Sequence, residues 1–587
     1  MLSRLRNLVR GSGLSWLDSV VAILDSAFER PPIWGTGGNE GSGSYTTAFL
    51  AAVIECILSD RWQASLSCSL WRTRPTRQSW DGSFFDQDHQ KLGEVKGPFR
   101  QFLPGAKSTP WDLLLTFEGV LAVESGLTKR ADVGDKKFLS SPFSFAPLGA
   151  GTGASSPRDE IEENQGRKKL GRGEQWFPLW SSPSTYREIR HLFREGRCSI
   201  GRRGARTPID AAQAIRRLGS TSGITTFLRY GYLQRLNLTT HFAVPLGSLR
   251  VTESVKASLI DDLSGWWERV HKLILQKNLP EKLIHTERRL SEAIFSALTH
   301  DNHPKRWQAV LRAAVAVESL QATGTAINVG PIPELRPEWI HAIDDGSPEV
   351  RLALALGSAH AYDQEGARDT VRHHWLPLKA GGRRFLAEEN RLVRDPRVVM
   401  FGRDTLRDLS ALVQRRLIES SQRGQRRSRL LCAPGCGADL ADLAQFVDNL
   451  LDIDKIFELA RALMAVRWQQ WDRSRRPGAQ GSFAHPVEGW LAIRLCCLPW
   501  PLYDDRDIPA DQRIVRLLSG GKSSQAIDLA ISRLRIVSLR PPLTAGWTDT
   551  KSSLLWAAAL AFPISKRSAR RAANILDPSI QRKEVTK

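Results

Sequence analysis

Three side chains in this sequence have the residue types of a metal-dependent nuclease. Asp81 is followed by Glu94 and Lys96, which form a Glu-x-Lys pair. Two carboxylates can hold Mg²⁺ while a lysine steadies the attacking water. Glu94 and Lys96 would have to project from one face of a strand, yet Gly93 and Gly97 bracket them and leave room for only a very short one. A solvated loop is the alternative interpretation, and we expect that the chain is not an enzyme.

A second set of side chains has the composition of a nucleic-acid contact. Residues 201–251 hold eight arginines against one acid, Asp210, and interleave the arginines with aromatic residues. Arginine forks bind phosphate through two hydrogen bonds, and tyrosine and phenylalanine rings stack on exposed bases. The candidate contacts are Arg202, Arg203, Arg206, Arg216, Arg217, Arg229, Tyr230 and Arg235. The alternative is a packed scaffold whose arginines simply cover a solvated face.

A glycine-rich loop supplies a weaker group of candidate contacts. It comprises Gly35, Gly37, Gly38 and Asn39 and leads into a helical pattern. Backbone amides at the start of a helix can cradle a phosphate. The loop matches neither the P-loop nor the dinucleotide-binding fingerprint, because it has no Gly-Lys-Ser/Thr ending and no clear preceding strand. We therefore expect it to approach a nucleic-acid backbone or a neighbouring subunit.

Cysteines and histidines do not show the spacing of a metal site. Cys432 and Cys436 would supply half of a zinc site, but no second pair stands nearby. His373 and His374 have no partner at metal-binding spacing, so we expect both to be structural. The sequence therefore predicts no metal and no cofactor.

Local signals predict two helices and an extended segment in the arginine-rich stretch. Thr207, Pro208 and Asp210 have the spacing of a capping box at the start of a helix. A second helix is expected over about 223–235. The residues after it, around 241–247, read as extended.

The wider pattern predicts an α+β fold, with short strands in a mixed N-terminal half and a mainly α-helical C-terminal half. We expect an N-terminal α/β region with the glycine-rich loop over 1–148, a mobile linker over 149–174, an Arg-rich central module over 175–255, and a helical region of two sub-bundles over 256–587. Within the first region, Thr109 and Pro110 announce a helix that Gly126 closes.

Net charge is the most unusual property of the composition. A formal net charge of +21 predicts salt-sensitive attraction to a polyanion such as DNA or RNA. A membrane surface is the weaker choice, because no run of eighteen apolar residues occurs. Seven cysteines without framework spacing fit a reducing compartment, and no signal-type apolar core follows the N-terminus. We expect a cytoplasmic protein that binds no membrane.

Several sequence blocks, in colinear order over nearly the whole chain, point to one family. The most specific is ARTPIDAAQAIRRLGSTSGITTFLRYGYLQR, from Ala205; PPIWGTGGNEG, TPWDLLLTFEGVL, EQWFPLW, DDGSPEVRLALALGS and QFVDNLLDIDKIFELARAL accompany it. Together they resemble the large subunit of the type I-G (formerly I-U) CRISPR Cascade effector complex. Members of that family usually carry a further N-terminal region ahead of these blocks.

The resemblance implies a non-catalytic subunit in antiviral defence. Such a subunit helps bind target double-stranded DNA beside the protospacer-adjacent motif and stabilises the R-loop of guide RNA and DNA. Its implied partners are the guide CRISPR RNA, the target DNA, the other Cascade backbone subunits and a recruited helicase-nuclease. The helical C-terminal half would take the place of a separate small subunit. Two alternatives stay open: the nuclease described above, and an assembly scaffold without DNA contact.

Overall fold

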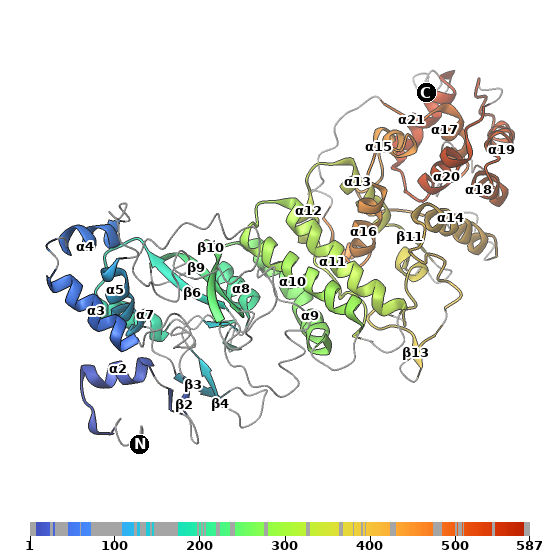
Figure 1. The fold of residues 1–587 in the computed structure, drawn as a ribbon. Coiled ribbons are helices and arrows are strands. Elements are labelled where there is room, and N and C mark those ends of the chain that lie inside the picture. Colours follow the sequence, from blue (N-terminus) through green and yellow to red (C-terminus); the bar gives the residue numbers. More distant parts are fainter. Residues whose placement is uncertain are drawn as a thin grey trace, which may run out of the picture. The chain divides into compact units, whose positions relative to one another are not determined.

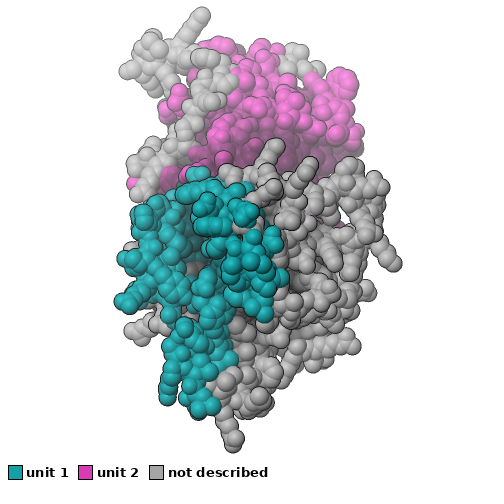
Figure 2. Space-filling view, turned by 60° about the vertical axis from the view of Figure 1, so that its left-hand side comes forward, with its two compact units in different colours: residues 1–258 teal, residues 259–587 magenta. Residues whose placement is uncertain are grey.

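The chain forms two compact units in the computed structural model, Met1–Ser258 and Leu259–Lys587 (Figure 2). The structure describes residues 7–20, 22–23, 28–29, 45–58, 60, 62–71, 109–122, 126–129, 137–140, 144–145, 174–195, 199–200, 203–204, 207–218, 223–234, 241–274, 280–323, 329–362, 368–379, 381–388, 391–393, 395–422, 430–472, 484–498, 502, 508, 510–542 and 546–579. Short antiparallel strands occur mainly in the first unit and helices dominate the second, which confirms the α+β class. The division falls close to residue 256, where the helical region was expected to begin. The expected linker over 149–174 lies outside the described residues except for Glu174.

The first unit combines helices with short strands (Figure 1). In chain order its elements are α2 (Ser12–Val20), β1 (Ala22–Ile23), β2 (Phe28–Glu29), α3 (Tyr45–Leu58), α4 (Trp62–Trp71), α5 (Pro110–Val120), β3 (Gly126–Lys129), β4 (Lys137–Ser140), β5 (Ser144–Phe145), β6 (Glu174–Trp180), α7 (Tyr186–Glu195), β7 (Ser199–Ile200), β8 (Arg203–Gly204), α8 (Pro208–Leu218), β9 (Ile224–Gln234) and β10 (His241–Arg250).

Helix α5 begins where the sequence predicted and ends earlier. The Thr109 hydroxyl accepts a hydrogen bond from the Asp112 amide at 3.3 Å, and the Asp112 carboxylate accepts one from the Thr109 amide at 2.7 Å. The last turn closes with bonds between residues three apart, from the amides of Leu121 and Ala122. Gly126 lies in β3 instead of ending the helix, so the predicted end is wrong.

A four-stranded antiparallel sheet organises the arginine-rich stretch. Its strand order is β10-β9-β6-β5, with β9 paired to β10 on one side and to β6 on the other (Figure 1). Trp176 of β6 lies opposite Arg229 of β9, which in turn lies opposite Gly247 of β10. This register decides which side chains share a face.

The second helix predicted over 223–235 is wrong, because β9 occupies these residues. Thr225, Thr226, Phe227 and Tyr230 favour a strand, and Gly231 in the middle weakens a helix. Pairing along both edges of β9 then fixes the extended conformation. The extended segment expected around 241–247 is confirmed by β10.

The second unit is built mainly from helices and begins within η4 (Val255–Ile260), a 3-10 helix that spans the boundary. Its elements are α9 (Asp261–Ile274), α10 (Glu281–Thr299), α11 (Pro304–Thr323), α12 (Glu338–Ile343), α13 (Pro348–Gly357), β11 (His360–Tyr362), β12 (Arg368–Thr370), η5 (Val371–His374), β13 (Ala387–Glu388), β14 (Arg391–Leu392), α14 (Thr405–Gln422), α15 (Leu440–Val447), α16 (Ile453–Leu463), η6 (Trp468–Gln470), α17 (Glu488–Leu495), α18 (Gln512–Ser519), α19 (Ser523–Ile536), α20 (Thr550–Ala559) and α21 (Lys566–Leu576).

Close packing of α13 on α16 shows how tightly this unit is built. Gly357 ends α13 so near α16 that a Cβ atom placed on it would lie 2.6 Å from the Cβ of Leu463. Ser347 caps the other end of α13 by accepting a hydrogen bond from the Val350 amide, and Pro348 opens the first turn. Across the described residues, no helix is long and apolar enough to cross a membrane.

Candidate nucleic-acid interface

Helix α8 carries two neighbouring arginines with opposite environments. The predicted capping box is confirmed: the Thr207 hydroxyl accepts from the Asp210 amide at 3.0 Å, and the Asp210 carboxylate accepts from the Thr207 amide at 3.3 Å. The helix is buried from Pro208 through Arg216, whereas Arg217 is exposed. Of this pair, only Arg217 is exposed to solvent.

Arg216 instead connects the end of α8 to the segment that follows β10. Its side chain donates hydrogen bonds to the backbone carbonyl of Thr252, at 3.2 Å, and to the Thr252 hydroxyl. Its own carbonyl accepts a hydrogen bond from the Ser254 amide at 2.8 Å. Because only 5% of Arg216 is exposed, its role in this structure is to hold the helix in place.

Arg229 is also buried, in an ion pair within the sheet. Its Nη2 atom lies 2.9 and 2.8 Å from the two carboxylate oxygens of Glu174, and its Nε atom donates to the same carboxylate at 3.1 Å. The Trp176 indole donates to Glu174 at 2.8 Å, and the guanidinium lies 5.3 Å from the centre of the Trp176 ring. Burial raises the pKa of the Glu174 carboxyl, and the charge of Arg229 acts in the opposite direction. Arg229 therefore stabilises the sheet and is not placed to bind phosphate.

The other face of the sheet is more open to solvent. By register, Phe177 of β6 lies opposite Leu228 of β9, and Leu179 lies opposite Thr226. Tyr230 shares this face and packs edge to face on Phe177, with ring centroids 5.7 Å apart. We call the solvent-accessible part of this surface the open face; its members are Phe177, Leu179, Thr226, Leu228, Tyr230, Ser248 and Arg250, all half-buried or exposed, whereas Gln175, which pairs with Tyr230 on the same side, is buried.

The open face combines aromatic rings with a positive charge. Arg250, on β10, lies opposite Thr226 and is exposed. Sheets that bind single-stranded nucleic acid stack bases on aromatic side chains and hold the backbone with arginine or lysine. Sequence reasoning singled out Tyr230 but not Phe177 or Arg250. Strand alternation along β9 separates the buried Arg229 from the half-buried Leu228 and Tyr230, but Phe177 and Arg250 join this face only through the pairing of β6 and β10 with β9.

Most of the other predicted contacts lie outside the described residues. These are Arg202, Arg206, Arg235, Gly35, Gly37, Gly38 and Asn39, together with the nuclease candidates Asp81, Glu94 and Lys96. Arg203 belongs to strand β8. The structure thus brings Tyr230 to the open face, places Arg217 on the surface of α8, and gives Arg216 and Arg229 internal partners.

Helices α3 and α4 present an exposed apolar surface in the same unit. We call it the apolar stripe; its members are Leu50, Ile54, Ile57 and Leu58 of α3 and Trp62, Leu70 and Trp71 of α4, each between 41% and 75% exposed. Those of α3 recur at helical spacing and lie along one side of the helix. Exposed apolar surface of this kind is typical of a protein–protein contact.

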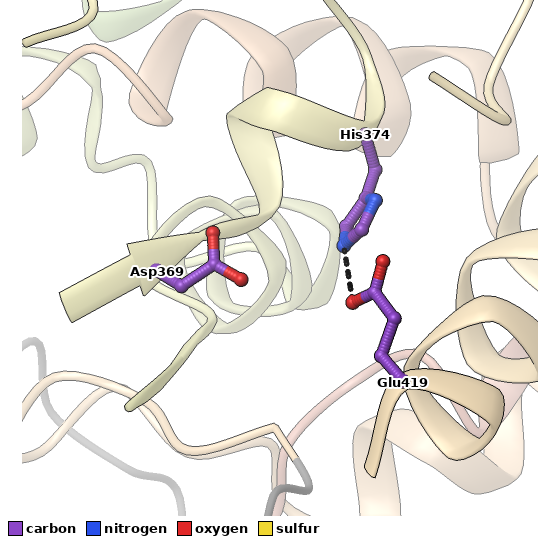
Figure 3. A group of neighbouring side chains, drawn as sticks. All are labelled: Asp369, His374 and Glu419. Atoms are coloured by element: carbon purple, nitrogen blue, oxygen red, sulfur yellow. Dashed lines mark ion pairs between the residues drawn. The ribbon is translucent and has the colours of Figure 1, made fainter. Parts of the chain in front are cut away.

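A buried polar cluster in the second unit has the residue types of a metal site. Asp369 of β12, His374 of η5 and Glu419 of α14 each offer a ligand atom, and these atoms lie within 4.8 Å of one another (Figure 3). The prediction that His374 has no metal-spaced partner missed this group, because the partners come from separate elements. Burial and the charge of Arg416 lower the pKa of His374 to about 4, so its ring is neutral at neutral pH.

Arg416 holds the acidic side of this cluster. Its Nη1 atom lies 2.6 Å from Asp369 Oδ2 and 3.7 Å from Glu419 Oε2. Burial acts to raise the pKa of the Asp369 carboxyl, but the hydrogen bond with His373 and the charge of Arg416 outweigh it and hold the pKa below its usual range.

Comparisons with known proteins add no relative from which a role could be carried over. No protein-family model matches the chain, and no curated protein matches it. The function proposed for the chain therefore depends on its own residues and their geometry.

Proposed function

We propose that the chain is a non-catalytic, nucleic-acid-binding large subunit of a type I-G (I-U) CRISPR Cascade surveillance complex. In this role it helps bind target double-stranded DNA next to the protospacer-adjacent motif and stabilises the R-loop. Base pairing with the guide RNA supplies the sequence specificity, so the protein needs mainly backbone, shape and stacking contacts.

The open face is the structural observation that supports the nucleic-acid-binding part of this proposal, and the resemblance of the sequence blocks supports its assignment to Cascade. Phe177 and Tyr230 place aromatic rings on the face that also carries the exposed Arg250, opposite Thr226, and the other face of the sheet is closed by the pair of Glu174 and Arg229. The displaced DNA strand of an R-loop exposes bases that can stack on such a surface. A net charge of +21 supports the same class of ligand.

An assembly role is supported by a separate observation, the apolar stripe. Ile57 and Leu58 are 72% and 75% exposed at the end of α3, and Trp71 is 75% exposed at the end of α4. Most of this surface is aliphatic and offers a nucleic acid neither charge nor hydrogen bonds, whereas a partner subunit would bury it. If the chain is only an assembly scaffold, a partner subunit binds the apolar stripe and no DNA binds the open face.

The test is a binding assay of the guide-loaded complex on target duplex across a salt series, with Mg²⁺ present. Tyr230→Leu keeps apolar bulk but removes the aromatic ring, and we expect it to weaken binding by about 1–3 kcal/mol per base unstacked. Arg250→Gln should reduce the slope of log affinity against log salt by about 1.

Arg383→Gln provides a matched control, because Arg383 is a 79% exposed arginine in the other unit. It should leave both the affinity and the salt slope close to those of the wild type. Unchanged binding by Tyr230→Leu and Arg250→Gln would favour the scaffold. Cleavage of the DNA without an added nuclease would favour the alternative that the chain is a metal-dependent nuclease with Asp81, Glu94 and Lys96 in its active site.

A further inference from the structure

Two buried acceptor atoms face each other between His374 and Glu419 (Figure 3). His374 Nε2 lies 3.7 Å from Glu419 Oε2, and the two side chains are 1% and 6% exposed. His374 Nδ1 lies 2.9 Å from the carbonyl oxygen of Arg397. Because a carbonyl only accepts hydrogen bonds, Nδ1 carries a proton, and in this tautomer of the neutral ring the lone pair of Nε2 is directed toward Glu419.

Neither of these facing atoms has a hydrogen-bond partner in the part of the chain that the structure describes. An unpartnered lone pair in a buried site has a high free-energy cost, and here two of them point into the same space. A cation between His374 Nε2 and Glu419 Oε2 would satisfy both. Asp369 adds a second carboxylate, since one ligand atom from each of the three residues lies within 4.8 Å of the others.

We propose that Asp369, His374 and Glu419 bind a divalent transition-metal ion, for which Zn²⁺ is the best match. One imidazole nitrogen with two carboxylates is a donor set that zinc accepts, whereas Mg²⁺ prefers oxygen ligands and retained water. Zinc bonds to these atoms are about 2.0–2.2 Å long, so each ligand atom needs to move toward the ion by about 1 Å or less.

The surroundings of the three ligands also suit a metal. The bond from His374 Nδ1 to a backbone carbonyl fixes the ring with Nε2 directed inward, as second-layer partners of metal-binding histidines do. Arg415 donates to the outer oxygen of Glu419, Oε1, at 2.7 Å. The inner oxygen, Oε2, is the one that faces His374.

The guanidinium of Arg416 would compete with a metal ion for the Asp369 carboxylate. This guanidinium is a resident cation bound to Asp369 at 2.6 Å, so an incoming Zn²⁺ must displace it or share the carboxylate with it. The site should therefore bind zinc weakly in the wild-type chain and more tightly when Arg416 loses its charge. The metal would fasten η5 to α14, a structural role that suits the burial of the ligands.

The experiment is a zinc titration of the full chain after chelator treatment, followed by calorimetry and by thermal melting. His374→Gln and Glu419→Gln should each lower the affinity of this site by about tenfold or more, and Arg416→Gln should raise it. His300→Gln is the matched control, an imidazole outside the cluster, and should change nothing. Circular dichroism establishes that each variant is folded.

X-ray absorption of the zinc-loaded wild-type chain keeps the test independent of the variants. The expected first shell holds nitrogen and oxygen with one imidazole; sulfur ligands would assign the zinc to the chain's cysteines and overturn the proposal. The proposal also fails if His374→Gln and Glu419→Gln retain wild-type affinity, or if Arg416→Gln binds zinc no more tightly than the wild type.

Discussion

Two buried arginine–carboxylate groups, one in each unit, differ in how completely their polar atoms are satisfied. In the sheet, Glu174 receives the Arg229 fork and the Trp176 indole, and none of these three side chains has an unpartnered polar atom among the described residues. In the second unit, Arg416 binds Asp369, while His374 Nε2 and Glu419 Oε2 have no hydrogen-bond partner among the described residues and lie 3.7 Å apart. The first group is a closed structural pair, and the second retains the capacity to bind a cation.

Removing one partner from the closed pair should have the largest effect on stability. Glu174→Gln leaves the Arg229 charge buried without a counter-ion, which costs about 3–5 kcal/mol. Hydrogen exchange of the amides in β6 and β9 would report the loss as faster local opening. The double variant Glu174→Gln with Arg229→Met should regain much of the protection; equal loss in both variants would contradict the ion-pair explanation.

The two groups should respond to acid in opposite directions. In the metal-free chain, the folded pKa of His374 is lowered to about 4. The unfolded chain therefore takes up a proton first, and up to about 3 kcal/mol of stability is lost as the pH falls from 6.5 to 4. Glu174 has a raised folded pKa, so the folded state takes up its proton first and gains relative stability as the pH falls toward the unfolded value.

Chemical denaturation across this pH range, with chelator present, measures the response of His374. His374→Gln should flatten the loss of stability between pH 6.5 and 4. Glu174→Gln should leave that part of the profile in place. Identical profiles for His374→Gln and the wild type would mean that another group causes the acid sensitivity.

Arg216 and Arg217 extend the comparison to neighbouring residues on one helix. Arg216→Met removes the hydrogen bonds to Thr252 from a buried site, and we expect a loss of about 1–3 kcal/mol. Arg217→Gln changes an exposed side chain and should alter stability by less than about 0.5 kcal/mol. In the DNA-binding assay only Arg217→Gln is expected to act through charge, with a reduction of the salt slope by about 1 or less. If Arg216→Met changed the salt slope and Arg217→Gln lowered the stability, the roles of the two arginines would be reversed.

The smallest expected effect concerns the cap of α8. Thr207→Ala removes the side-chain acceptor of the Asp210 amide and should cost about 1 kcal/mol. Thr207→Ser keeps the acceptor and serves as the control. Hydrogen exchange in the first turn of α8 measures the difference, and equal protection in both variants would show that burial alone holds this end of the helix.

Local signals predicted the parts of the fold that depend on a few adjacent residues. The capping box at Thr207 and the start of α5 at Thr109 follow from side-chain acceptors three residues from an amide. The β9 strand was mistaken for a helix because its pairing partners, β6 and β10, decide its conformation and the sequence does not say which segments pair.

The two buried polar groups also depend on contacts between residues that are distant in the sequence, so the sequence alone did not predict them. Glu174 and Arg229 are 55 residues apart, and composition alone counted Arg229 as a phosphate contact. His374 meets Asp369 across a short turn and Glu419 from a later helix, a combination that matches no metal-binding spacing. Charge and residue type predicted the class of ligand. Only the pairing of β9 with β6 and β10 shows that Arg229 lies on the buried face of the sheet and Arg250 on the open face.

The apolar stripe bears on the fate of a copy that has not yet assembled. Trp71 and Leu58 are each 75% exposed, so a chain without its partner subunits exposes apolar surface to which chaperones bind, and such chains are degraded by proteases. If a partner subunit covers the stripe, the cell would retain only as many copies as there are partners. Co-expression with the other subunits should then raise the yield of this chain, and Leu58→Lys should raise the yield of the chain produced alone.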